Sequence, residues 1–183
     1  MKHRSADIFF SSNVLKILGF LIDRPGKDFT PGEIQKEVLL SRTGVFFALR
    51  TLAEKGLVSK AGRGKFFVYS AIHTEPVVKQ YKVVKNILDL DGLLERLKPV
   101  SKRVVLFGSA QRGEDTPQSD IDLFIVSSDP DQVREVLAKT KSDRKIQPVV
   151  LTPAQVPDFQ EKEKVFYREV ERGITLWENT DER

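Results

Sequence analysis

The stretch LFGSAQRGEDTPQSDIDL, residues 106–123, decides how this chain is interpreted. One apolar run ends at Gly108-Ser109, and a second begins at an Asp-x-Asp sequence formed by Asp120 and Asp122. Short apolar runs bounded by turn residues are typical of buried β-strands. The stretch therefore predicts two strands, the first closed by a Gly-Ser pair and the second opened by two aspartates.

These residue types in this order suit phosphate and metal chemistry. Gly108 lets the backbone approach a triphosphate because no Cβ atom is in the way. Ser109 can donate its hydroxyl and its N–H to phosphate oxygens at the start of a following helix. Asp120 and Asp122 lie two residues apart on a strand, so both carboxylates point to the same side. Magnesium commonly takes one or two carboxylates together with substrate phosphates and waters, so we expect a site for Mg²⁺ or Mn²⁺ here.

The stretch resembles the signature of minimal nucleotidyltransferases of the DNA polymerase β-type superfamily, in which Gly-Ser is followed after ten residues by Asp-x-Asp. The resemblance implies catalytic and metal-binding roles for Asp120 and Asp122. It implies nucleotide-binding roles for Gly108, Ser109, Arg112 and Ser119. The implied reaction moves a nucleoside monophosphate from an NTP to a hydroxyl of a protein, a nucleic-acid end or a small molecule. Relatives of minimal type include antitoxins that nucleotidylate a partner toxin, so the resemblance accommodates a protein partner.

Two positions depart from the pattern of active members. Their usual third carboxylate, on a later strand, aligns with Gln147 in the apolar run 146–151. A neutral amide can neither act as a base nor supply a negative charge. Ala110 replaces a basic residue that often follows Gly-Ser. Two hypotheses stay open: an enzyme that uses Asp143, Glu161 or water for the third role, or a regulator whose second domain only binds nucleotide.

The first 75 residues predict three helices and a hairpin. Apolar residues recur at spacings of three and four, Ser41 is a good N-cap, and Gly56 can end the third helix. The pattern predicts helices over 12–23, from Thr30 onward and over 41–55, then strands over 57–59 and 65–72 around a turn at 60–64.

The segment from Glu33 to Leu57 resembles the helix-turn-helix of winged regulators, whose third helix can enter a DNA major groove about 12 Å wide. The resemblance implies DNA contacts from the helix and from the wing, made by Arg42, Thr43, Arg50, Lys60, Arg63 and Lys65. Phe46 and Phe47 fall where DNA readers usually carry polar side chains. They could contact thymine methyl groups or a protein partner, so a protein-docking or dimerising winged helix stays open.

The whole chain predicts an α+β protein of two domains. We expect a winged helix-turn-helix over 1–75, a linking helix over 76–98 and a nucleotidyltransferase-like domain with a mixed sheet over 99–183. The linking segment could either connect the domains or form a homodimer. Further helices are predicted at about 130–140 and 160–172, with a last strand over 174–177.

Charge and composition agree with this division. Residues 1–75 carry 12 Lys and Arg against 7 Asp and Glu, whereas residues 101–183 carry 13 against 16. A basic first part favours a polyanion such as DNA, and carboxylates in the last part can hold a metal. There is no cysteine, which excludes disulfides and thiolate zinc sites. No apolar run reaches the roughly 18 residues of a membrane span, and Met1-Lys2-His3-Arg4 does not open a secretory signal, so we expect a cytoplasmic protein.

Overall fold

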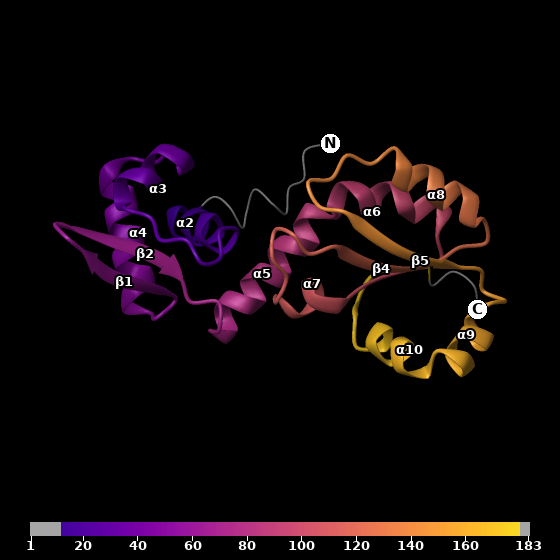
Figure 1. Cartoon of the computed structure of the whole chain (residues 1–183). Helices are drawn as coiled ribbons and strands as arrows, with labels where there is room; N and C mark the ends of the chain where they lie inside the picture. The colour runs from indigo at the N-terminus through magenta and orange to yellow at the C-terminus, as the bar shows by residue number, and fades with distance from the viewer. Residues whose placement is uncertain (1–11, 180–183) are drawn as a thin grey trace. The chain divides into compact units, whose positions relative to one another are not determined.

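The computed structural model describes residues 12–179, so the expectation about a secretory signal at Met1–Arg4 lies outside the described residues. The chain folds as two compact units, Met1–Lys85 and Asn86–Arg183, and the division falls within helix α5 (Pro76–Asp89). Figure 1 shows helices beside a small hairpin in the first unit and helices around a larger sheet in the second. The predicted α+β class with a mixed sheet is therefore confirmed.

Residues 12–75 of the first unit form three helices followed by a β-hairpin. The helices are α2 (Asn13–Ile22), α3 (Pro31–Val38) and α4 (Arg42–Glu54), and the strands are β1 (Val58–Arg63) and β2 (Phe66–Ala71). Thr30 and Glu33 form a capping box at α3, and the Ser41 hydroxyl accepts the Gly44 N–H at the start of α4, 3.1 Å away. The apolar stripes of the helices meet in one core, whose fully buried members include Ile17, Leu21, Ile22, Ile34, Leu49 and Leu52.

The predicted turn at residues 60–64 is wrong, because β1 continues through Arg63. Arg63 pairs with Phe66, which leaves only Gly64 and Lys65 to reverse the chain. Gly64 has a φ of 62°, which glycine adopts without steric cost and which two-residue hairpin turns require. The run from Lys60 to Gly64 suggested a turn, but backbone pairing with β2 keeps residues 60–63 extended.

The second unit is built on a four-stranded sheet in the order β5-β4-β3-β6. Strand β3 (Arg103–Phe107) is antiparallel to β4 (Ile121–Val126) and to β6 (Ile174–Glu178), and β4 is parallel to β5 (Ile146–Leu151). The helices are α6 (Asp91–Leu97), α7 (Gly108–Arg112), α8 (Pro130–Ala138), α9 (Val156–Lys162) and α10 (Lys164–Glu171), with a 3₁₀ turn at Lys98–Val100. The predicted single helix at 160–172 is wrong, because the chain bends at Glu163 between α9 and α10.

Each face of this sheet has its own core. Figure 1 shows α6 and α8 on one face and α9 and α10 on the other. Leu106, Leu123 and Ile125 pack toward α6 and α8, whereas Phe107 and Phe124 pack toward α9 and α10. Because side chains alternate along a strand, Asp122 lies on the same face as Phe124. Among residues 12–179, no helix combines the length and the apolar character needed to cross a membrane.

Candidate active site

The two aspartates of the motif lie at the start of β4, the inner strand of the parallel pair that β4 forms with β5. Asp120 immediately precedes the strand, and Asp122 is its second residue. Partial burial raises the pKa of Asp122 above the ordinary value of an aspartate, and the nearby carboxylate of Asp120 raises it further. The guanidinium groups of Arg112 and Arg144 oppose this shift. The two carboxylates are therefore close enough to repel each other, and a cation between them would relieve that repulsion.

Gly108 lies directly against the carboxylate of Asp122. A Cβ atom placed on Gly108 would lie 3.0 Å from Cγ and 3.3 Å from Cβ of Asp122, and closer still to a carboxylate oxygen. Gly108 also has a φ of 72°, in the left-handed region that favours glycine. Two features therefore bring the end of β3 close to Asp122. Phe107 is the register partner of Asp122, and Gly108 has no side chain to keep the backbone away.

The edge of β5 faces the same pair of aspartates. Gln147 is the register partner of Asp122 in the parallel ladder, so the residue aligned with the third carboxylate lies beside the Asp-x-Asp. Lys145 lies beside Asp120, and its Nζ is 3.2 Å from Oδ2 of that residue. Asp143 lies in the loop before β5 and Glu161 lies on α9, and both are exposed. Over residues 12–179, no group of three or more His, Cys, Asp or Glu side chains is gathered as a metal site.

The other expected nucleotide-binding residues surround the motif. Ser109 follows Gly108 at the start of α7 and is partly buried. Arg112 ends α7, where its side chain is 46% exposed and pairs with Glu114 at 2.9 Å. The hydroxyl of Ser119 accepts the N–H of Thr116 at 2.9 Å, so Ser119 shapes the turn before Asp120. Nucleotide binding by Gly108, Ser109, Arg112 and Ser119 stays a prediction.

A buried polar cluster behind the motif was not predicted. The carboxylate of Asp115, whose side chain is 2% exposed, accepts from Arg144 Nη1 at 2.7 Å and from Asn86 Nδ2 at 3.0 Å. Asn86 also donates to the carbonyl of Ala110 at 3.0 Å. Desolvated charges are stable only when paired and hydrogen-bonded in this way. The cluster therefore fixes the loop that follows α7.

Arg144 connects this cluster to the aspartates. Its Nε donates to the carbonyl of Ser119 at 2.9 Å, and its Nη2 donates to the carbonyl of Asp120 at 3.2 Å. The guanidinium thus holds the backbone on which Asp120 stands, while its charge acts on Asp122. Arg144 lies 29 residues from Asp115, so no local pattern in the sequence indicates that the two are paired.

The expected DNA contacts lie on the surface of the first unit. The six residues are all exposed: Arg42, Thr43 and Arg50 on α4, Lys60 and Arg63 on β1, and Lys65 in the turn. Arg50 pairs with Glu54 one turn later, with Nε and Oε1 2.7 Å apart. Lys60 places its Nζ 4.0 Å from the centre of the Phe67 ring. The wing thus presents cations together with aromatic side chains.

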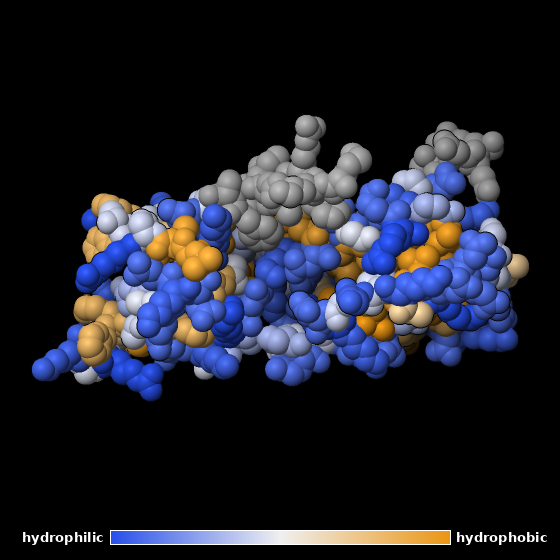
Figure 2. Space-filling view, turned by 90° about the horizontal axis from the view of Figure 1, so that it is seen from above, coloured by the Kyte–Doolittle hydropathy of each residue, from blue (hydrophilic) through white to orange (hydrophobic). Residues whose placement is uncertain are grey.

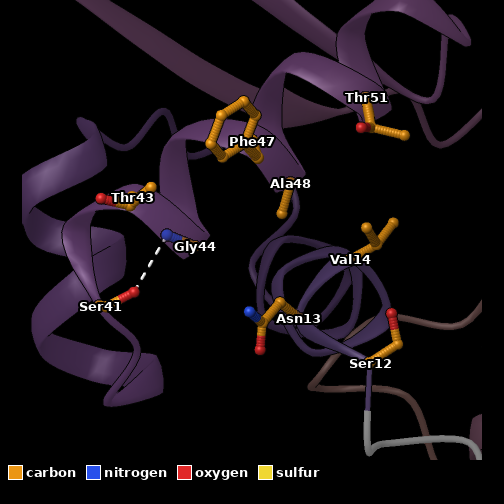
Figure 3. A pocket seen from close by; sticks show the side chains of 9 residues that line it. All are labelled: Ser12, Asn13, Val14, Ser41, Thr43, Gly44, Phe47, Ala48 and Thr51. Atoms are coloured by element: carbon orange, nitrogen blue, oxygen red, sulfur yellow. Dashed lines mark hydrogen bonds between the residues drawn. The ribbon is translucent and has the colours of Figure 1, made fainter.

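Four phenylalanines in the described part of this unit are exposed, namely Phe46, Phe47, Phe66 and Phe67. Figure 2 shows hydrophobic patches among hydrophilic surface over the first unit. Phe47 lines a hollow between the N-terminal ends of α2 and α4, together with Asn13, Thr43 and Thr51 (Figure 3). Phe66 lines a second hollow with Arg42 and Val45. Apolar and basic side chains are therefore interleaved on this surface.

Comparison with known proteins identifies the second unit. Residues 89–174 match the family described as "Nucleotidyltransferase domain". The match includes Gly108-Ser109 and the two aspartates, so the resemblance of this stretch to nucleotidyltransferases is confirmed. No curated protein matches the chain significantly.

Two solved structures resemble parts of the chain. A nucleotidyltransferase candidate from Sulfolobus solfataricus is 15% identical, with a TM-score of 0.39, over 56% of this chain and 89% of its own. TrmBL2, an archaeal chromatin protein whose structure shows a novel mode of DNA binding, is 17% identical, with a TM-score of 0.31, over 85% of this chain and 68% of its own.

Proposed function

We propose that the second unit is a divalent-metal-dependent nucleotidyltransferase that moves a nucleoside monophosphate from an NTP to a hydroxyl. One observation carries the proposal: Gly108 lies against the carboxylate of Asp122, with Asp120 close by. Phosphates that approach the backbone at Gly108 and Ser109 would meet the two carboxylates. If Asp120 and Asp122 only marked the end of a strand, the contact between Gly108 and Asp122 would not be required.

The residues present fit a hard cation such as Mg²⁺. Asp120 and Asp122 offer carboxylate oxygens, the ligands that magnesium prefers, and water and triphosphate oxygens can complete its octahedron. Burial and, after it, the carboxylate of Asp120 raise the pKa of Asp122, and a positive ion between the carboxylates would stabilise their charged forms. When bound, Mg²⁺ would neutralise phosphate charge and so stabilise the transition state of phosphoryl transfer.

The transfer is an in-line displacement at the α-phosphorus. The oxygen of the acceptor hydroxyl forms a bond to the α-phosphorus, and the bond from that phosphorus to the oxygen shared with the β-phosphate breaks. Pyrophosphate leaves with the electron pair, and the proton of the hydroxyl goes to solvent water. Gln147 cannot accept that proton because an amide is not a base at neutral pH. Arg112 can pair with phosphate oxygens, and Ser109 can donate a hydrogen bond to them.

Label transfer tests this proposal. The full chain is incubated with Mg²⁺, cell extract as the acceptor source and each α-³²P-labelled NTP, beside Asp120→Ala/Asp122→Ala and a control, Asp131→Ala. Asp131 carries an exposed carboxylate that pairs with Arg134. We expect macromolecular label that survives in the control and disappears in the double variant. Saturable NTP binding without label transfer would instead support the regulator that only senses nucleotide.

We also propose that the first unit binds duplex DNA through α4 and the wing. The supporting observation is the set of exposed cations on α4, β1 and the turn, which can neutralise DNA phosphates. Neutralised phosphates release counterions, and this makes binding salt-dependent. Affinity for DNA should fall as salt rises and should fall further in Arg42→Ala/Arg50→Ala. Lys16→Ala, on α2, is the matched control. Salt-independent binding to a protein, lost in Phe46→Ser/Phe47→Ser, would contradict the DNA proposal.

A further inference from the structure

Four side-chain positions form a small grid at the start of β4 and β5. The parallel register pairs Asp122 with Gln147, and two residues before each of them Asp120 lies beside Lys145. The N–H of Ile121 donates to the carbonyl of Lys145 at 2.8 Å, which fixes this register where the strands begin. Two carboxylates therefore face one ammonium and one amide on the same face of the sheet.

This grid has too little negative charge for two divalent ions. Two-metal sites hold their ions about 3.5–4 Å apart and need carboxylates that bridge or flank both of them. Here two aspartates supply two negative charges, Lys145 cancels one, and Gln147 adds none. Over the described part of the chain, no third acidic or histidine side chain joins them.

The Lys145 ammonium lies beside one of the two aspartates. Its Nζ is 3.2 Å from Oδ2 of Asp120, on the side of that carboxylate that faces β5. A lysine ammonium is a compact point charge with three donors, and it can contact a phosphate oxygen as well as a carboxylate. Because the Lys145 side chain is 70% exposed, the ion pair contributes little to stability. The exposed ammonium is therefore free to contact a phosphate that approaches Asp120.

We infer that this site takes one divalent ion per chain, and that Lys145 supplies the positive charge that a second ion would otherwise supply. This inference rests on the proposed function, since it concerns the same two aspartates. It assigns a ligand-contacting role to Lys145. It also explains how the domain could act on a triphosphate although Gln147 stands beside Asp122 in place of a carboxylate.

Manganese binding tests the inference without measuring catalysis. Mn²⁺ is titrated into the full chain in the presence of one equivalent of α,β-methylene-ATP, and the free ion is followed by electron paramagnetic resonance against a protein-free mixture. We expect one tightly bound Mn²⁺ per wild-type chain. Lys145→Ala/Gln147→Asp, which removes the ammonium and adds the missing carboxylate, should bind two. Lys141→Ala, in the same loop, should bind one.

The number of bound ions distinguishes failure of the inference about Lys145 from failure of the proposed function. Two tight ions in the wild type, or one ion in Lys145→Ala/Gln147→Asp, would overturn the inference about Lys145 and leave the proposed function standing. No bound ion in the wild type would overturn both. In addition, Lys145→Ala should weaken binding of α,β-methylene-ATP in Mg²⁺ by about tenfold, the usual effect of losing a charged hydrogen bond. Unchanged affinity would contradict a contact between Lys145 and phosphate.

Discussion

The backbone of Gly108 and the carboxylate of Asp122 lie so close that no side chain fits between them. This contact joins the end of β3 to the start of β4, and it brings the two halves of the Gly-Ser and Asp-x-Asp motif together. The ten residues between Ser109 and Asp120 form α7 and a loop that the buried Asp115 anchors. The motif is therefore one site in space, although it is two short segments in sequence.

Gly108→Ala should damage this site more than it damages the fold. The positive φ alone costs about 1 kcal/mol for a residue with a Cβ atom, and the new methyl group must displace the Asp122 carboxylate. We expect Mn²⁺ affinity to fall at least about tenfold, measured by paramagnetic resonance. Gly62→Ala is the control, because Gly62 has open space around its Cα atom. Equal Mn²⁺ affinity in the two variants would show that the contact has no role in metal binding.

Asp122→Asn should stabilise the metal-free protein at neutral pH. Burial and Asp120 raise the pKa of Asp122, so ionising this carboxyl costs more in the folded state than in the unfolded state. The stability that Asp122 provides is complete below the pKa of an unfolded aspartate, about 3.9, and is lost as the pH rises through its higher folded value. Melting in EDTA should therefore give a higher Tm for the variant at pH 7, with a smaller difference near pH 3.

Magnesium should reverse this order. Added Mg²⁺ should raise the Tm of the wild type and leave that of Asp122→Asn nearly unchanged, since ligand bound only to the folded state stabilises it. A wild type as stable as Asp122→Asn in EDTA at pH 7 would contradict the repulsion between the two aspartates.

Arg144→Met should be strongly destabilising. It leaves the Asp115 carboxylate, 2% exposed, without its guanidinium partner, and breaking a buried pair costs about 3–5 kcal/mol. The free energy of unfolding from urea denaturation measures this effect. Arg134→Met removes an exposed ion pair and should cost less than about 1 kcal/mol. Similar losses in the two variants would mean that the cluster around Asp115 does not anchor the loop.

Glu54→Gln should strengthen DNA binding if α4 faces DNA. Glu54 pairs with Arg50 on the exposed side of α4, so it competes with phosphates for the guanidinium and repels them. We expect affinity to rise about threefold at low salt, with a smaller gain at high salt, measured by fluorescence anisotropy. Glu37→Gln, on α3, is a control for the change in net charge. Weaker binding in Glu54→Gln would place DNA on another surface.

Local patterns predicted most of the fold because each element carries its own signals. Ser41 and Gly56 mark the two ends of α4, Thr30 with Glu33 forms the cap of α3, and the apolar runs of β3 and β4 flank the motif. Where the prediction from local sequence was wrong, contacts formed in the folded chain decided the structure. Residues 60–63 are held in β1 by pairing with β2, and no glycine or proline marks the break at Glu163 between α9 and α10.

The candidate site was predictable only where its residues are close in sequence. Gly108 and Asp122 belong to one recognisable motif, whereas Asn86, Asp115 and Arg144 come from three separate segments and meet only after folding. Lys145 lies outside any motif, and only the parallel register of β4 and β5 brings it to Asp120. The sequence thus indicated the chemistry of the site, and the structure was needed for the residues that hold it in place.

Anomalous diffraction from a crystal of the full chain grown with Mn²⁺ and α,β-methylene-ATP tests the central claim most directly. The two aspartates should share one ion, seen as a single peak in contact with carboxylate oxygens of both Asp120 and Asp122 and with the triphosphate. A triphosphate bound elsewhere, or Mn²⁺ peaks that touch neither carboxylate, would contradict it.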